Sequence, residues 1–211
     1  MENIDELVAR LAQGASPVKP ASHPFMLSLK WIAVAVIYLG VSLAISGLRP
    51  DLMTALHDGW FLAELLSLLS IFIVTALSAA LLAFPDLHQK RLLVFAPVLP
   101  VFVFLMLMYF SWLNDKPPAA MPMHSFECTL SILLVALLPA VGAFYAMRQY
   151  ASIHHRQAGS VALLCAFSVG ALWLRLHEQT NSIVHVIEWH YLPMLLVAFV
   201  GMWLGKRLLK W

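Results

Sequence analysis

Residues 121–128 read MPMHSFEC and gather side chains that bind soft metals or react with oxidants. Thiolate, thioether and imidazole are ligands that suit Cu(I), and imidazole with carboxylate suits Zn²⁺ or Cu(II). Cys128 is the strongest candidate. We expect this thiol to be exposed at a helix N-terminus, where the helix dipole favours its thiolate. Thioethers are oxidisable as well, so the stretch predicts redox sensing at Cys128, Met121 and Met123.

His124 and Cys128 are four residues apart and share one face of a helix that starts by Ser125 or slightly earlier. Further candidate ligands lie in a second polar segment, which follows the fifth apolar stretch of the chain. We predict that copper or zinc binds here as a signal. The predicted ligands are Cys128, His124, His177, Glu178, His185 and His190. No compact motif such as CxxC or HExxH joins them. The alternative stays open that these are interfacial histidines and gap-filling methionines.

The composition defines the element type that must position these residues. The chain has 211 residues, of which 62% are hydrophobic and 11% charged, and its mean hydropathy is +0.84. Such values exclude an ordinary soluble domain, and a net charge of +2 gives no reason to expect nucleic-acid binding. We predict an all-α membrane protein with six transmembrane helices near 29–47, 60–83, 92–113, 126–147, 159–176 and 190–208.

Lysine and arginine predict how these six helices are oriented. If the N-terminus is cytoplasmic, the cytoplasmic segments hold ten of the 13 Lys and Arg residues and the outer segments hold three. The positive-inside rule then places both termini in the cytoplasm. Short loops and an even number of spans suit a bacterial inner membrane. The candidate ligands would lie on the periplasmic side.

The segment before the first span predicts an amphipathic helix that binds a protein. Ile4, Leu7, Val8 and Leu11 recur at helical spacing, and acidic residues occupy other faces. A helix that lies on the lipid surface is the alternative, but such helices are usually rich in Lys and Arg on the polar face. The chain therefore divides into a cytoplasmic partner-binding helix with its tether, 1–25, and a transmembrane sensor domain, 26–211.

Four short features occur along nearly the whole chain: SPVKP after the first helix, GLRPDL after the first span, one Cys at the start of the fourth span and the ending LGKRLLKW. With them the chain resembles the NrsF family of membrane-embedded negative regulators of extracytoplasmic-function sigma factors. The resemblance implies an anti-sigma factor that releases its sigma factor on metal or oxidant stress. Relatives often carry a second Cys after the fifth span, where this chain has Glu178. A disulfide between those two positions is therefore excluded here.

Glu64 lies inside the second predicted span, where an ionisable side chain needs a partner or a role. We predict a structural pairing, with Arg49 or the histidine cluster within reach. A small metal or ion transporter that uses Glu64 and the outer cluster is the competing hypothesis, and a haem-binding oxidoreductase subunit is a third. Cys165 lies in the middle of the fifth span and reads as a small buried residue. No hydrolase triad is apparent, so we do not expect an enzyme.

Overall fold

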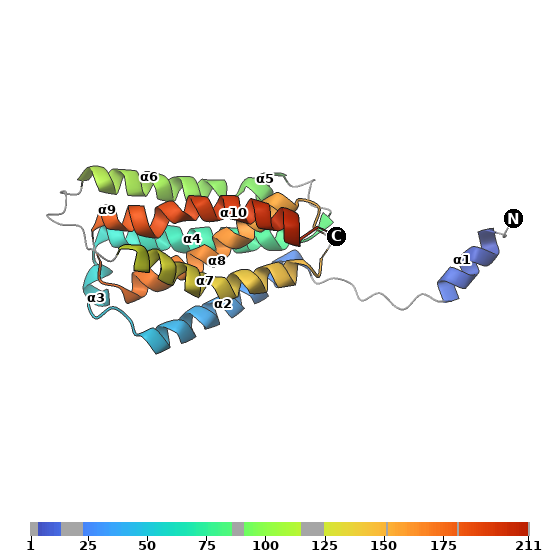
Figure 1. The fold of residues 1–211 in the computed structure, drawn as a ribbon, viewed down its shortest axis with the longest axis horizontal. Helices are drawn as coiled ribbons and strands as arrows, with labels where there is room; N and C mark the ends of the chain where they lie inside the picture. Colours follow the sequence, from blue (N-terminus) through green and yellow to red (C-terminus); the bar gives the residue numbers. More distant parts are fainter. Residues whose placement is uncertain are drawn as a thin grey trace.

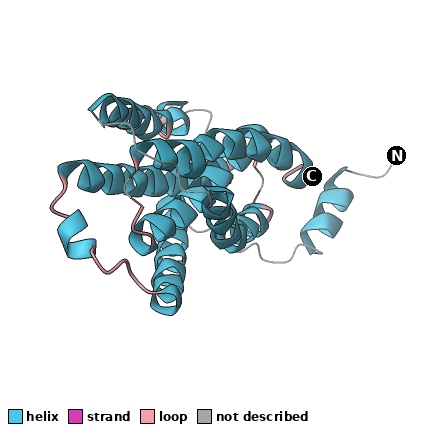
Figure 2. Cartoon of the chain, turned by 60° about the vertical axis from the view of Figure 1, so that its left-hand side comes forward, coloured by secondary structure: helices cyan, strands magenta, loops and turns pink. Residues whose placement is uncertain are grey.

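The structure is a computed structural model that describes residues 4–13, 23–85, 91–114, 125–150, 152–180 and 182–210. All secondary structure in the described part is helical, joined by short loops and turns, and these residues form no strand (Figures 1 and 2). Its elements are α1 (Ile4–Gln13), α2 (Pro24–Ser46), α3 (Leu52–Ala55), α4 (Gly59–Leu82), α5 (Arg91–Phe95), α6 (Val98–Asn114), α7 (Ser125–Met147), α8 (His155–His177), α9 (Ile183–His185), the π-helix η2 (Val186–Tyr191) and α10 (Leu192–Leu208).

The helices confirm an all-α, multi-pass architecture. Within the described residues, five segments are long and apolar enough to cross a membrane: α2, α4, α7, α8 and the continuous run from Ile183 to Leu208. The third predicted span, 92–113, is instead divided into α5 and the shorter apolar helix α6. Pro97 explains the break, because a proline disfavours helical geometry in the residue before it. The orientation of the termini and the division at residue 25 stay predictions.

Helix α8 forms the centre of the bundle and packs against α4, α7 and α10. In the most apolar windows, 67% of the residues of α8 and 56% of those of α4 are buried, against 6% for α2. The core between these helices is apolar and includes Leu68, Ile71, Ile132 and Phe167. Helix α2 therefore lies at the periphery of the bundle, and α4 and α8 form most of its buried core.

Glycines bring α8 and α10 into backbone contact. A Cβ atom added to Gly201 would lie 2.6 Å from the carbonyl oxygen of Gly159 and 2.7 Å from the Cα of Ser160. Gly205 packs in the same way on the backbone of His155 and Gly159. Close approach through small residues is how transmembrane helices gain packing energy in lipid, where hydrophobic burial offers little.

A proline inside α7 creates a bond between α7 and α2. Pro139 has no N–H, so the carbonyl of Val135, four residues earlier, loses its partner within the helix. The hydroxyl of Tyr38 on α2 donates to that carbonyl at 2.9 Å. Helix α2 is thus held to α7 at a point where the sequence of α7 frees a backbone acceptor.

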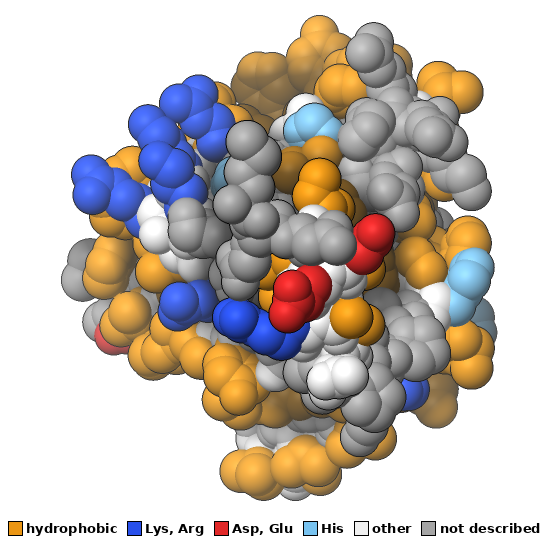
Figure 3. Space-filling model, turned by 90° about the vertical axis from the view of Figure 1, so that its right-hand side faces the viewer, with side chains coloured by type: hydrophobic (Ala, Val, Ile, Leu, Met, Phe, Trp, Pro, Cys, Tyr) orange, Lys and Arg blue, Asp and Glu red, His pale blue; other side chains and the backbone are white. Residues whose placement is uncertain are grey.

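The two ends of the bundle differ in charge. The end at which α2 begins and α10 stops, here called the basic end, carries Lys30, Arg148, Arg156, Lys206, Arg207 and Lys210. Figure 3 looks onto this end and shows Lys and Arg side chains gathered over part of it. Figure 1 shows α1 set apart from the bundle beyond the same end. The opposite end, here called the site end, holds α3, α9 and the start of α7.

Candidate functional site

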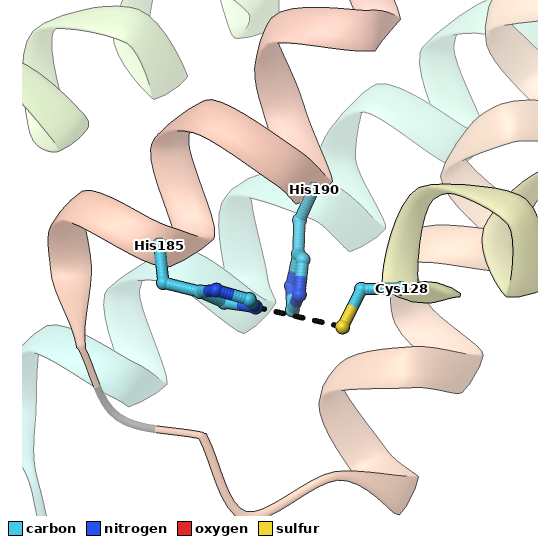
Figure 4. Close-up of side chains that lie close together, drawn as sticks. All are labelled: Cys128, His185 and His190. Atoms are coloured by element: carbon cyan, nitrogen blue, oxygen red, sulfur yellow. Dashed lines mark hydrogen bonds between the residues drawn. The ribbon is translucent and has the colours of Figure 1, made fainter. Parts of the chain in front are cut away.

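Three of the predicted ligands meet at the site end. Sγ of Cys128, in the first turn of α7, lies 3.5 Å from Nε2 of His185, and the rings of His185 and His190 are 5.1 Å apart. One ligand atom from each of the three residues lies within 4.8 Å of the others. Figure 4 shows Cys128 facing both histidines. The structure therefore brings together donors that are up to 62 positions apart in the chain (190 − 128).

The π-helix η2 is what turns both histidines toward Cys128. Residues five apart in an α-helix are rotated by about 140°, so an α-helix would point His185 and His190 in different directions. A π-helix pairs residue i with i+5 and brings such residues close to one line. The hydroxyl of Thr129 donates to the carbonyl of Trp189 and ties η2 to α7. π segments of this kind are frequent at functional sites.

Glu178 completes the cluster from the end of α8. Its carboxylate oxygens lie 3.5 and 3.6 Å from Sγ of Cys128, and Oε2 lies 3.7 Å from Nε2 of His190. Thr180 donates to Oε1 at 2.6 Å and fixes the carboxylate. The side chain of Glu178 is 28% exposed, whereas Cys128, His185 and His190 are buried. Glu178 is therefore the most exposed member of the cluster.

Three separations in this cluster are close to those of a tetrahedral metal site. They are 3.5 Å from Sγ of Cys128 to Nε2 of His185, 3.5–3.6 Å from Sγ to the Glu178 carboxylate, and 3.7 Å from Glu178 to Nε2 of His190. With Zn–S of about 2.3 Å and Zn–N or Zn–O of about 2.0–2.2 Å, ligand atoms lie roughly 3.3–3.6 Å apart. The cluster also has polar atoms to spare: Nδ1 of His185 and both ring nitrogens of His190 are buried and have no hydrogen-bond partner among the described residues. Buried polar atoms are normally satisfied. Zinc or copper held by Cys128, Nε2 of His185 and one ring nitrogen of His190, with Glu178 beside them, would supply a partner for that nitrogen of His190.

Two predictions about this site are corrected by the structure. Cys128 lies in the first turn of a helix, as predicted, but it is only 9% exposed, because η2 and the end of α8 cover it. His177 is not a ligand of the cluster: its Nδ1–H donates to the carbonyl of Gly47 at 2.9 Å, and its ring stacks on Trp173. The predicted residues Met121, Met123 and His124 lie outside the described residues, so their roles stay predictions.

Glu64 has a structural partner, but it is not the expected one. Arg175 of α8 donates to Glu64 from Nε at 2.7 Å and from Nη2 at 2.9 Å, and the hydroxyl of Tyr191 donates to the same carboxylate. Arg49 instead pairs with Asp51 at 2.8 Å. This guanidinium lowers the pKa of the Asp51 carboxyl. The expected pairing of Glu64 is confirmed, and Arg49 as its partner is wrong.

Sequence reasoning passed over Arg175, which links Glu64 to the segment that carries Glu178. Besides Glu64, it donates from Nη1 to the carbonyl of Thr180 at 2.7 Å, within the segment that carries Glu178. The signal was present, because an arginine inside the run ALWLRLH needs a buried partner as much as Glu64 does. Tyr191 gave no comparable signal, since tyrosines are common near membrane interfaces.

The last turn of α8 also holds the end of α2. The N–H of Arg49 donates to the carbonyl of Leu176 at 2.9 Å, and the indole N–H of Trp173 donates to Oγ of Ser46 at 3.0 Å. Gly47 allows this approach because its φ of 86° lies in the region that favours glycine, so the chain turns back at the end of α2. The segment 173–178 thus contacts the cluster, α4 and α2.

These features define a class: an all-α, multi-pass membrane protein with a buried thiol, imidazole and carboxylate cluster at one end of its bundle. A family model, NrsF, negative regulator of sigma F, matches residues 11–211. The chain therefore belongs to the NrsF family, as its motifs indicated. No curated protein and no solved structure matches it.

Proposed function

We propose that this protein is a membrane anti-sigma factor that holds an extracytoplasmic-function sigma factor through α1 and releases it when metal or oxidant reaches the cluster at the site end. Membership of a family of negative regulators of sigma F supports a regulatory role. The observation that carries the binding half is the apolar stripe of α1. Its members, Ile4, Leu7, Val8 and Leu11, are all exposed.

The stripe has the form of a helix that binds a groove in another protein. Four apolar side chains on one face are left in water, while Asp5 and Glu6 occupy the first turn. Burying each large apolar side chain contributes roughly 1.5–3 kcal/mol. A short helix gains stability when its apolar face packs on a partner. The acidic first turn disfavours the anionic surface of a bilayer as the alternative partner.

Replacing the stripe tests this half of the proposal. The full chain is purified in detergent from membranes of its source, and co-purifying proteins are identified by mass spectrometry. Leu7→Asp/Leu11→Asp should lower the captured sigma factor by at least about 100-fold, since two buried leucines contribute several kcal/mol. Ala9→Asp/Gln13→Asp adds the same charge to the opposite face of α1 and should retain the partner. Equal loss in both variants, or capture of transport proteins alone, would contradict the proposal.

The sensing half rests on the geometry around Cys128. The other cysteine, Cys165, lies about 18 Å along α8 from His177, because twelve residues separate them at 1.5 Å each. A disulfide within one chain is therefore no route for the signal. Metal bound by Cys128, His185, His190 and Glu178, or oxidation of Cys128, are the remaining routes that involve the described residues.

Metal content separates these routes. The purified protein is equilibrated with Zn²⁺ or Cu(I), and the bound metal is measured by inductively coupled plasma mass spectrometry. Cys128→Ser and His190→Ala should each lower bound metal by tenfold or more at limiting free ion, and Cys165→Ser should bind like the wild type. In a sigma-dependent reporter, the same two variants should blunt induction and keep basal repression. Unchanged metal and unchanged induction in Cys128→Ser/His190→Ala would remove the cluster from consideration.

Transport is the weaker alternative for a physical reason. A carrier site at Glu64 must exchange its partner for an ion, yet this carboxylate accepts hydrogen bonds from two nitrogens of Arg175 and from Tyr191. Removing such a partner leaves a buried charge, which costs several kcal/mol. We place the protein in a bacterial inner membrane, and the positive-inside rule puts its basic end in the cytoplasm.

A further inference from the structure

A cavity between α2, α7 and α8 is independent of the cluster and lies nearer the basic end. Its volume is about 450 Å³, which is within the range of roughly 300–1,000 Å³ typical of ligand-binding pockets. Its floor is formed by buried small residues, among them Ala79 of α4 and Ala162 and Ala166 of α8. Its rim is formed by residues that are exposed on the membrane-facing side, including Val34 and Val141.

The position and lining of the cavity restrict its occupant to an apolar chain. Every helix that lines it is a candidate membrane span, so the medium at its rim is hydrocarbon. The only polar side-chain groups among the lining residues are the Trp31 indole, the Tyr38 and Tyr145 hydroxyls and the Cys165 thiol. The Tyr38 hydroxyl is already bonded to the carbonyl of Val135. An acyl chain fits such a lining.

Two cations flank the cavity at the basic end. Lys30 is one turn before Val34 on α2, and Arg148 is three residues after Tyr145 at the end of α7, so helical spacing places both on the faces that line the cavity. Both are exposed, and neither forms an ion pair with another described residue. Lys and Arg at a membrane surface attract the phosphate of anionic lipids.

We propose that the groove between α2 and α7 binds one anionic phospholipid, with an acyl chain in the cavity and the headgroup phosphate at Lys30 and Arg148. The proposal goes beyond sigma-factor regulation and does not depend on it. The lipid would fill the space that separates α2 from α7 on the basic-end side of the Tyr38 bond. Because α2 leads to α1, the bound lipid would support the helix that carries the proposed partner-binding segment.

Native mass spectrometry of the detergent-solubilised full chain tests the site, with phosphatidylglycerol and phosphatidylcholine as probes. Gly142→Trp fills the cavity, because Gly142 lines it and a side chain there meets no atom within 4 Å. Gly40→Trp is the matched control, since Gly40 is equally open but does not line the cavity. Lys30→Ala/Arg148→Ala removes the headgroup contacts, and Lys206→Ala/Arg207→Ala removes two cations of α10 at the same end.

We expect the wild type to retain phosphatidylglycerol about tenfold better than phosphatidylcholine. Gly142→Trp should lose both lipids, Lys30→Ala/Arg148→Ala should lose the preference, and the two controls should match the wild type. Retention of phosphatidylglycerol by Gly142→Trp overturns the cavity, and an unchanged preference in Lys30→Ala/Arg148→Ala overturns the headgroup contacts. A wild-type dimer that Gly142→Trp converts to a monomer would show that a second copy of the chain is the occupant, which also overturns the proposal.

A second measurement does not depend on the folding of Gly142→Trp. Val141 lines the cavity and is exposed at its rim, so alkylation of Val141→Cys by N-ethylmaleimide in a Cys128→Ser/Cys165→Ser background reports whether the cavity is filled. Added phosphatidylglycerol should slow this reaction several-fold, and phosphatidylcholine should slow it less. An alkylation rate that neither lipid changes would overturn the proposal.

Discussion

Replacing Glu64 by Gln should destabilise the bundle strongly, because it leaves the charge of Arg175 buried without a counter-charge. The side chains of Arg175 and Glu64 are only 5% and 6% exposed. Their two-pronged contact, at 2.7 and 2.9 Å, places the charge centres about 4 Å apart, where the attraction is about 4 kcal/mol at an effective dielectric constant of 20. Breaking one side of a buried pair costs about 3–5 kcal/mol, which agrees.

The assay is thermal unfolding in detergent, followed by tryptophan fluorescence. For a protein of about 200 residues, 1 kcal/mol corresponds to about 2–4 °C in Tm, so Glu64→Gln should lower Tm by roughly 6–20 °C. Glu64→Gln/Arg175→Gln removes both charges and leaves two amides that hydrogen-bond to each other, so it should recover more than half of that loss. Glu188→Gln removes an exposed carboxylate near the same end and should leave Tm within about 2 °C.

Losses of Tm in Glu64→Gln and in Arg175→Gln alone that add up to the loss in the double variant would refute the reasoning. They would mean that the contact between Glu64 and Arg175 contributes little and that each residue acts through other neighbours. A wild-type Tm in Glu64→Gln would refute it more directly, since it would show that the Arg175 charge is already neutralised or hydrated.

Two further predictions concern the packing of the helices. Gly201→Ala should lower the free energy of unfolding by about 1–3 kcal/mol, because its Cβ would press on the backbone of α8. Gly40→Ala has open space around its Cβ and should not destabilise the protein. Thermal unfolding in detergent measures Tm for both variants. Tyr38→Phe should lower the free energy of unfolding by about 0.5–1.5 kcal/mol in the wild type. In a Pro139→Ala background the Val135 carbonyl regains a partner within α7, so the loss should be smaller. An equal loss in both backgrounds contradicts this account.

Hydropathy predicted most of the fold because the bilayer imposes a simple length and composition on each helix. It placed α2, α4, α7 and α8 to within a few residues of their observed bounds. It was least accurate at the sixth span, which was predicted to begin at residue 190 because the polar residues His185, Glu188 and His190 suggested a loop. In the structure this stretch is already helical from Ile183, because its two histidines face the interior of the bundle rather than lipid.

The sequence predicted the chemical types of the ligands at the candidate site but not which histidines meet there. The residue types around Cys128 were sufficient to nominate thiol, imidazole and carboxylate ligands, yet the choice among histidines depended on helix geometry. A period of 3.6 residues sets His185 and His190 apart, and only the π turn of η2 aligns them. Burial of Cys128 was equally hidden, since it results from the covering of one helix end by two others that are distant in sequence. Pairing of Glu64 with Arg175 also depends on which helices are neighbours.

The arrangement of α8 explains how a change at the cluster could reach α1. Glu178 directly follows the last residue of α8, and the turn before it bonds to the end of α2 through Trp173, Leu176 and His177. Each such hydrogen bond contributes about 0.5–1.5 kcal/mol. Coupling between regulated sites is typically about 1–3 kcal/mol. In the proposed function, metal or oxidation that moves Glu178 would need to alter only one or two of these three bonds to shift α2. Helix α2 is the helix that follows the proposed partner-binding segment in the chain.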